Sequence, residues 1–284
     1  MKRDLFSKNI EKILALAKSK TFTSRQLNAF RNELKDRGYI SKSMPHDLFI
    51  KRINEYQQNQ LDIELNGDFL SVFAYDSGVD EDQMLLGFKK NSFFSMSTAL
   101  NKQGFSDFRN KFIFISQELS VKNLGGSTSG LTQDAIDQAF KKDYRRTSVI
   151  GKYKDKHIVF LSPKNTHGFE VITTNSSIRT SSINRSFVEM VVNVQYFVDS
   201  LAVINVFKPL KDSLQIDVIY KVLKEFNYIY PYYQSVGYYL EKIGFNRKQL
   251  QKFKNEVKGL RFYTDKKADS YQYDEYWQTY HIVA

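Results

Sequence analysis

A glycine-rich loop at residues 125–130 (GGSTSG) is the first stretch whose residue types could support chemistry. A P-loop cradles phosphates with its backbone N–H groups and places Lys and then Ser or Thr directly after its last glycine. Here Gly130 is followed by Leu131 and Thr132. We therefore expect a hinge loop ahead of a helix that runs from about Thr132 to Phe140, rather than a nucleoside-triphosphate cradle.

Two carboxylates after this loop invite comparison with a nucleotidyltransferase. Such an enzyme combines a Gly-Ser pair with two closely spaced acids that hold Mg²⁺. Gly126-Ser127 followed by Asp134 and Asp137 imitates that pattern. Acids three residues apart on a helix do not converge as acids two residues apart on a strand do. An enzyme that uses Ser127, Asp134 and Asp137 is therefore the rival hypothesis, and a loop with helix caps is the interpretation we favour.

Other residue types exclude several classes of enzyme. The chain has no cysteine, which removes disulfides, thiolate zinc sites, iron–sulfur clusters and a cysteine nucleophile. No serine lies in a G-x-S-x-G elbow, and the histidines lack the spacing typical of a metal site. We expect no metal, no cofactor and no catalytic activity. The histidines, each expected at the surface or in a loop, are His46, His157, His167 and His281.

The positive charge of the chain is concentrated near its beginning. Residues 1–60 carry 13 Lys and Arg against 6 Asp and Glu, whereas residues 61–284 carry 29 against 25. Lys and Arg neutralise phosphates, so a basic module joined to a nearly neutral domain is typical of a nucleic-acid-binding protein. A region that is basic for solubility alone is the alternative.

Composition also indicates the cellular compartment of the protein. Hydrophobic residues make up 42% of the chain and aromatic residues 15%, which is ample for a packed core. No apolar run approaches the ~18 residues of a membrane-spanning helix, and no apolar signal segment follows Met1. Together with the lack of cysteine, this favours a reduced, cytoplasmic setting and no membrane partner.

Periodicity in the first 80 residues predicts three short helices. In each, apolar residues recur at the spacing of a helix with one buried face. Pro45 suits the first position of the third helix, and Gly38 suits the residue after the second. The expected helices cover residues 4–19, 25–37 and 45–58.

A hairpin is expected after these helices. Asn66-Gly67 separates two runs of strand-forming residues, 61–65 and 69–75, and this is a strong hairpin signal. Three helices and a hairpin in this order predict a winged helix-turn-helix domain over residues 1–80. In such a domain the third helix enters the major groove of DNA, while basic residues around it contact phosphates.

Basic and polar side chains on and around the third helix are the candidate DNA contacts. Lys51 and Asn54 suit base edges, whereas Lys42, Arg25 and Arg52 suit phosphates. A three-helix domain can also dock proteins, and the placement of charge is what favours DNA. The candidate DNA-binding residues are Arg25, Lys42, Ser43, His46, Lys51, Arg52 and Asn54.

The pattern changes after an acidic segment at residues 76–83. From residue 84 to residue 284, strand patterns are mixed with helical ones, and the last part is mainly helical. The chain as a whole is therefore expected to be α+β, with the DNA-binding domain followed by a larger mixed α/β domain that has a C-terminal helical portion. A basic cluster in this larger domain is either a solvated face or a second DNA-contacting surface. Its residues are Lys141, Lys142, Arg145 and Arg146.

The stretch Ser181–Phe207 predicts a central helix of the larger domain. Apolar residues cover most of its circumference, which places a helix inside a domain rather than on its surface. Arg185 and Glu189 interrupt the apolar face at a spacing of four residues, so they are expected to form an ion pair. We interpret both residues as structural rather than catalytic.

Tyrosine is abundant near the end of the chain, at residues 228–239 and within 262–280. Aromatic rings stack on bases in proteins that bind single strands. They also fill cores and anchor protein interfaces. We favour this second interpretation.

Five stretches, taken in order, resemble segments of the AbiEi-type antitoxins of type IV toxin–antitoxin systems. The third is similar to the S-x-E-R-T-L-I-D signature of that family, the fourth to its Y-P-Y-H-Q-A-I-G-F-Y-x-E pattern, and the fifth to its Y-D-x-x-W-x-x-Y ending. The stretches are Ser127–Phe140 (STSGLTQDAIDQAF), Ile158–Thr166 (IVFLSPKNT), Ser182–Glu189 (SINRSFVE), Tyr230–Glu241 (YPYYQSVGYYLE) and Tyr273–Tyr280 (YDEYWQTY).

The chain also departs from the family patterns. Asn184, Ser186 and Glu189 stand where the signature has Glu, Thr and Asp, and Tyr233 stands where the fourth pattern has His. The resemblance implies an antitoxin of an abortive-infection system that acts against phage. It would bind double-stranded operator DNA through its winged helix, repress its own operon as a transcriptional regulator, and counter a nucleotidyltransferase toxin. Direct contact with that toxin stays open.

Overall fold

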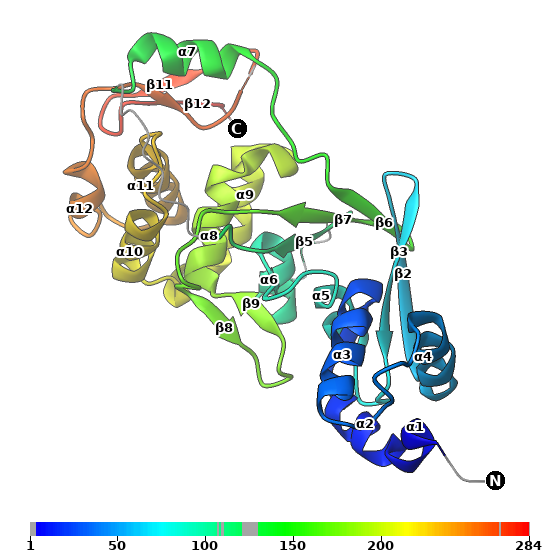
Figure 1. Ribbon diagram of the computed structural model, residues 1–284. Helices are drawn as coiled ribbons and strands as arrows, with labels where there is room; N and C mark the ends of the chain where they lie inside the picture. Colours follow the sequence, from blue (N-terminus) through cyan, green and yellow to red (C-terminus); the bar gives the residue numbers. More distant parts are fainter. Residues whose placement is uncertain (1–3, 107, 109–110, 121–129, 267, 284) are drawn as a thin grey trace. The chain divides into compact units, whose positions relative to one another are not determined.

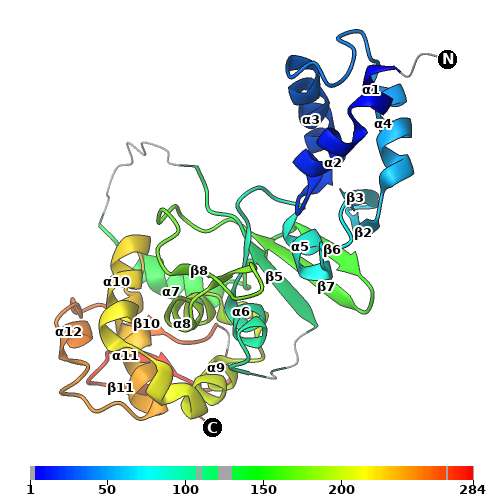
Figure 2. The ribbon, with the colours of Figure 1, turned by 90° about the horizontal axis from the view of Figure 1, so that it is seen from below.

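The computed structural model describes residues 4–106, 108, 111–120, 130–266 and 268–283 (Figures 1 and 2). The chain forms two compact units, one of residues up to Ser92 together with Val149–Ile158, and one of Phe93–Ser148 together with Val159–Ala284. Both units combine helices with strands, so the chain is α+β. This division differs from the expected contiguous ranges, 1–80 and 84–284, because a short segment near residue 150 returns to the first unit.

The first and third predicted helices of the first unit are shorter than expected, whereas the second, α3, has its expected length. The single helix expected over residues 4–19 is two helices that meet at Asn9, whose side-chain amide donates to the carbonyl of Leu5 at 2.9 Å. Such side-chain to backbone bonds compete with helix continuation. The third helix ends at Ile53 and continues only as one 3₁₀ turn, and Pro45 precedes its first residue as the N-cap. The elements are α1 (Leu5–Lys8), α2 (Ile10–Ala17), α3 (Ser24–Asp36), α4 (His46–Ile53), η1 (Asn54–Tyr56) and α5 (Glu81–Leu86).

The expected hairpin is confirmed. Asn66 and Gly67 have φ of 55° and 88°, the two positive values of the tight turn that matches strand twist. In Figure 1 the hairpin extends beyond α3 and α4. The strands of this unit are antiparallel, in the order β1-β3-β2-β6. They are β1 (Thr21–Thr23), β2 (Asn59–Leu65), β3 (Asp68–Ala74) and β6 (Ile150–Tyr153).

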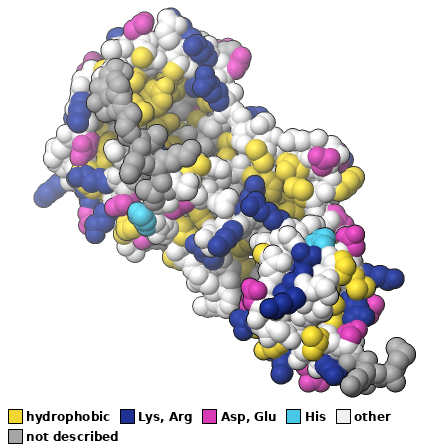
Figure 3. Space-filling model, viewed as in Figure 1, with side chains coloured by type: hydrophobic (Ala, Val, Ile, Leu, Met, Phe, Trp, Pro, Cys, Tyr) yellow, Lys and Arg dark blue, Asp and Glu magenta, His cyan; other side chains and the backbone are white. Residues whose placement is uncertain are grey.

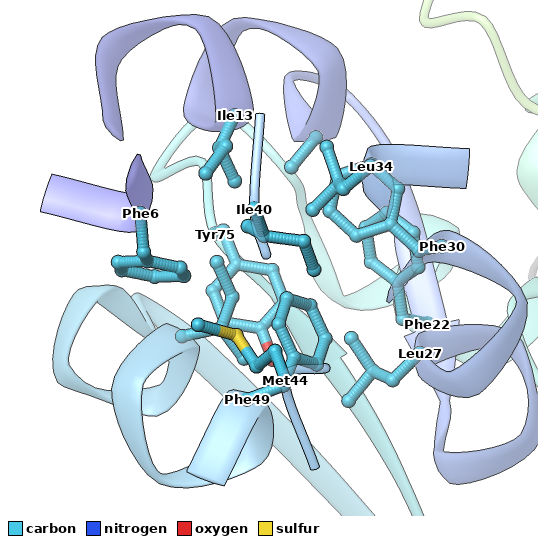
Figure 4. Close-up of a cluster of buried hydrophobic side chains, with 12 residues drawn as sticks. Phe6, Ile13, Phe22, Leu27, Phe30, Leu34, Ile40, Met44, Phe49 and Tyr75 are labelled. Atoms are coloured by element: carbon cyan, nitrogen blue, oxygen red, sulfur yellow. The ribbon is translucent and has the colours of Figure 1, made fainter. Parts of the chain in front are cut away.

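An aromatic core holds the helices of the first unit together (Figure 4). Phe49 of α4 packs edge-on against Phe6 of α1 and Phe30 of α3, with ring centres 6.5 and 6.4 Å apart. Phe22 of β1 lies 5.0 Å from Phe30, so the first strand is part of the same cluster. Because these rings are almost fully buried, packing rather than helix propensity supplies most of the stability of the short α4.

The second unit contains a mixed sheet and most of the helices. β7 carries the chain into this unit, and the strand order from there is β7-β5-β4-β9-β8, with β4 and β9 parallel. The strands are β4 (Phe93–Phe94), β5 (Phe112–Ser116), β7 (Lys156–Leu161), β8 (Val171–Thr173) and β9 (Arg179–Ser181). The helices are α6 (Met96–Lys102), α7 (Gln133–Lys141), α8 (Ile183–Val192), α9 (Ser200–Phe207), α10 (Ile216–Phe226), α11 (Tyr232–Ile243) and α12 (Gln251–Lys254).

The predicted central helix is present but broken. Its first half, α8, is buried along nearly its whole length and contacts α6, α9, α10 and α11. The single helix expected over Ser181–Phe207 is wrong, because a 3₁₀ turn (η2, Val194–Tyr196) separates α8 from α9. The amide of Asn193 donates to the carbonyl of Glu189 at 2.9 Å and ends α8, and Asp199 caps α9 by accepting from the N–H of Ala202. Polar side chains that bond the backbone thus override the apolar period.

The end of the chain is a small sheet, which the sequence did not predict. β10 (Phe262–Tyr263), β12 (Thr279–His281) and β11 (Gln272–Asp274) lie side by side in that order. The indole of Trp277 is fully buried against Gly237 of α11, where an added Cβ would lie only 2.2 Å from a ring carbon. Within the described residues no helix has the length and apolar character to cross a bilayer.

Candidate nucleic-acid interface

The turn between α3 and α4 positions the candidate interface. Thr23 and Gln26 cap α3 reciprocally, each side chain accepting from the other residue's backbone N–H. After α3, Gly38 takes a left-handed conformation with φ of 68°, and the buried side chains of Ile40 and Met44 pull the turn onto the core. This fixes the start of α4, whose inner face carries Phe49 and leaves the opposite face to solvent.

Four of the candidate DNA-binding residues present exposed side chains. Arg25 lies in the first turn of α3, Lys42 and Ser43 lie in the turn before α4, and Lys51 lies on the outer face of α4. Within the described part of the chain, no carboxylate lies in salt-bridge range of Arg25, Lys42 or Lys51. Figure 3 shows Lys and Arg side chains scattered over the visible face of the molecule, with Asp and Glu among them. Three cations without an intramolecular counter-charge can bind phosphates at no cost in lost ion pairs.

Arg52 already has partners inside the first unit. Its guanidinium pairs with the carboxylate of Asp4 at 2.5 Å and lies 5.6 Å from the ring centre of Phe6. The pKa of Asp4 is lowered, first by the backbone N–H of Ser7 and then by Arg52. The Arg52 side chain therefore joins α1 to α4. For its expected phosphate contact, the guanidinium must bind the carboxylate of Asp4 and a DNA phosphate at the same time.

Asn54 and His46 are the remaining candidates, and both are half-buried. The side-chain oxygen of Asn54 accepts a hydrogen bond from the hydroxyl of Tyr75 at 3.0 Å. Tyr75 is itself buried, and this desolvation raises its pKa. The 3₁₀ turn that begins at Asn54 explains why its side chain points toward Tyr75. A turn tighter than an α-helix rotates the side chain away from the outer face of α4.

Replacing Asn54 with Ala is expected to lower the free energy of unfolding by about 1–3 kcal/mol, because it leaves the buried Tyr75 hydroxyl without its acceptor. In a Tyr75→Phe background the same substitution should cost much less. Urea unfolding of the four proteins of this double-mutant cycle measures the difference. Equal losses in both backgrounds would contradict the hydrogen bond as the cause.

The surroundings of the interface are not uniformly basic. The outer face of α4 carries Asp47 beside Lys51, Glu55 follows in η1, and the hairpin carries acidic side chains but no Lys or Arg. Leu48 of α4 is an apolar side chain that is 42% exposed. Sequence reasoning missed Phe69, which is 75% exposed near the tip of the hairpin. The two-residue period of β3, which buries Val72, is the signal that could have found it.

The second basic cluster lies in the second unit. Lys141, Lys142 and Arg145 are exposed. Arg146 is exposed too, but its Nε donates to the carbonyl of Gln195 at 2.8 Å and its guanidinium lies 5.9 Å from the ring centre of Tyr196. Arg146 thus anchors the segment to the residues around Gln195 and Tyr196.

Of the residues of the rival enzyme hypothesis, the structure describes Asp134 and Asp137. Gly126 and Ser127 lie outside the described residues. One oxygen of Asp137 accepts from both the side-chain amide of Gln133 and the hydroxyl of Tyr263, at 2.8 and 2.9 Å. No group of three or more acidic or His side chains arranged to hold a metal ion occurs among the residues described. The contacts of Asp137 are those of a structural residue.

Comparison with known proteins bears on the fold. The sequence matches no protein-family model, and no curated protein matches it significantly. The structure is similar to the crystal structure of the RV2827C protein from Mycobacterium tuberculosis, with a TM-score of 0.51 and 10% sequence identity. The similarity covers 99% of this chain and 93% of that chain. At this identity it describes a shared fold and nothing more.

Proposed function

We propose that the first unit is a winged helix-turn-helix domain that binds duplex DNA, with α4 as its recognition helix and the β2–β3 hairpin as its wing. The observation that carries this proposal is the order of α2, β1, α3, α4, β2 and β3, with β3 paired between β1 and β2. This order leaves one face of α4 exposed, with unpaired cations at its edges. A helix presented in this way fits the major groove.

The proposed contacts divide by role. Arg25 and Lys42 neutralise phosphates on either side of the groove, and Ser43 supplies a hydroxyl donor to the backbone. Lys51 points from the outer face of α4 and reads a base edge, most favourably the O6 and N7 acceptors of guanine. The acidic hairpin makes no phosphate contact in this proposal.

The biological role that we infer is that of an AbiEi-type antitoxin. It binds its own operator, represses the operon and counters a nucleotidyltransferase toxin, without catalysis of its own. The resemblance of the five sequence stretches supports the antitoxin half, whereas the exposed basic side chains around α4 support the DNA half. The exposed Phe69 on an acidic hairpin favours a second candidate, a protein-docking module.

Binding to DNA from the region upstream of its own gene tests the role. We expect fluorescence anisotropy to show tighter binding to that duplex than to a shuffled duplex of equal length and composition. Lys51→Ala should reduce the discrimination between them by about 1–3 kcal/mol, because a base contact is lost. Equal affinity of the wild-type protein for both duplexes would contradict operator recognition. Absence of DNA binding, with co-purification of the neighbouring gene's product, would favour the docking module.

A further inference from the structure

A cavity of about 590 Å³ lies within the second unit, among α7, the segment that follows it, α8, α11 and β10. Its volume falls in the range of pockets that hold small organic ligands, roughly 300–1,000 Å³. The DNA-binding proposal makes no use of it. The chemistry of its walls indicates what it would hold.

One part of the wall is cationic. Lys142, Arg145 and Lys266 all line the cavity, and Asp143 is the acidic residue on its described wall. Burial lowers the pKa of Lys266, and the charges of Arg145 and Lys142 lower it further, while the charge of Asp143 partly offsets them. These three side chains are therefore close enough to repel one another. An anion with several oxygens would relieve that repulsion and accept hydrogen bonds from all three.

The buried carboxylate of Asp265, next to Lys266 in the chain, is hydrogen-bonded by neutral groups. Asp265 accepts from the N–H of Ser200 at 2.9 Å, from the hydroxyl of Ser200 at 2.5 Å and from the hydroxyl of Thr264 at 2.6 Å. These three hydrogen bonds hold the carboxylate in place. The Nζ of Lys266 instead lies between aromatic rings, 5.6 Å from the ring centre of Phe140 and 5.7 Å from that of Tyr144.

The rest of the wall is aromatic, with an unused polar group. Phe140 and Tyr263 stack at 4.9 Å, and Tyr230 and Tyr232 lie nearby against Phe262. Ser235 of α11 also lines the cavity, is 2% exposed, and its hydroxyl has no hydrogen-bond partner in the described chain. An unpartnered buried hydroxyl costs free energy unless something satisfies it. A flat ligand with polar edges would both pack on the rings and bond this hydroxyl.

We propose that this cavity binds a nucleoside phosphate, with the phosphates on Lys142, Arg145 and Lys266 and the base against the tyrosine rings. The ligand is either a free nucleotide or the terminal nucleotide of a single strand, since both present the same phosphate and base. Lys142 and Arg145, two residues of the basic cluster, thereby bind the phosphates of this ligand. The site is independent of α4, so duplex binding by the first unit is a separate matter.

Isothermal titration calorimetry of the full chain tests the proposal. The probes are ATP, GTP, CTP and UTP, sodium tripolyphosphate, and single-stranded RNA pentamers with a 5′-phosphate. We expect at least one nucleotide or pentamer to bind at least tenfold more tightly than tripolyphosphate, because the rings add base stacking. Binding of a free nucleotide identifies that source, and binding of a pentamer alone identifies a strand end. No binding of any probe below millimolar concentration, or equal affinity for tripolyphosphate, overturns the proposal.

Variants locate the site. Lys142→Ala with Arg145→Ala should weaken the bound probe at least tenfold, and both positions are exposed, so folding is not expected to suffer. Tyr230→Ala should weaken the nucleotide but leave tripolyphosphate unchanged. The matched control, Lys221→Ala with Lys248→Ala, removes two exposed charges of the same unit that do not line the cavity and should bind normally. Equal binding by the Lys142/Arg145 variant and this control would place the ligand elsewhere and sink the proposal.

Discussion

Replacing Arg185 with Met is expected to lower the free energy of unfolding by about 3–5 kcal/mol, the cost of leaving buried charges without their partner. The Arg185 side chain is fully buried. Its Nε lies 2.7 Å from a carboxylate oxygen of Glu189, and one of its terminal nitrogens lies 3.0 Å from Glu118. The ion pair of Arg185 and Glu189 expected from sequence is thus confirmed, and it is part of a larger network.

This network joins several elements of the second unit. The guanidinium of Arg185 also donates to the carbonyl of Phe169 at 2.7 Å and lies 4.9 Å from the ring centre of Phe93. Glu189 accepts from the hydroxyl of Ser181 at 2.7 Å. One side chain of α8 therefore fixes the strands and loops around it. Met has a similar volume to Arg, so the expected loss comes from charge and hydrogen bonds rather than from a cavity.

An exposed pair with the same spacing provides the control. Arg37 and Glu33 are also four residues apart, at 2.8 Å, but both side chains are largely solvated. Arg37→Met should cost no more than about 0.5 kcal/mol. Urea unfolding of the two variants separates the buried pair from the exposed one. A loss below about 1 kcal/mol for Arg185→Met would contradict the structural role of the network.

The pH dependence of this loss has a defined sign. Burial raises the pKa of Glu118, but hydrogen bonds from Thr166 and Gly168 and the charge of Arg185 outweigh it, so the pKa is lowered overall. A carboxyl whose pKa is lowered by folding stabilises the folded chain above its unfolded pKa, and this contribution is lost as pH falls through the folded pKa. The gap between wild type and Arg185→Met should therefore be largest near neutral pH and shrink below about pH 4.

Local signals in the sequence predicted the local structure well. The Asn66-Gly67 hairpin needs only two residues that tolerate positive φ, and α3 needs only its caps and one apolar face, so both were readable. The breaks at Asn9 and Asn193 were missed, because the apolar period runs through them. In both cases an asparagine side chain bonds a backbone carbonyl and ends the helix. The two asparagines can be read from the sequence, but the backbone hydrogen bonds that they form cannot.

Contacts between distant residues could not be predicted. Glu118 joins Arg185 across 67 positions, and no spacing rule connects them. The terminal sheet pairs β10 with β12 in parallel across a long connection, which leaves no hairpin signal. Gly237 and Trp277 lie in two of the stretches on which we base the proposed antitoxin role, and the close packing of the indole on Gly237 explains why a glycine and a tryptophan stand there.

The candidate interface also contains residues that local signals predicted and residues whose contacts are distant in sequence. Exposure of Arg25 and Lys51 agrees with the helical period of α3 and α4, and Lys42 is exposed in the turn between them. Arg52 and Asn54 are redirected by Asp4 and Tyr75, which are distant in sequence. Variants of these two residues would change stability as well as binding. Arg25 and Lys42 are therefore the cleaner probes of DNA contact.

Salt dependence gives the largest expected effect on DNA binding. Each phosphate neutralised by Lys or Arg contributes about −0.9 to the slope of log K against log salt concentration. Arg25→Ala with Lys42→Ala should therefore make the slope less steep by about 1.8 and weaken binding roughly 60-fold at 0.1 M salt, relative to a 1 M reference. The control Lys221→Ala with Lys248→Ala removes the same charge from the second unit and should keep the wild-type slope.

Anisotropy titration of duplex DNA from upstream of the gene, repeated at several salt concentrations, is the most direct test of DNA binding by the first unit. The wild-type protein and the control should show the same steep slope, and Arg25→Ala with Lys42→Ala a slope reduced by about 1.8. An unchanged slope for this variant, or no binding by the wild-type protein at low salt, would contradict a DNA interface around α4.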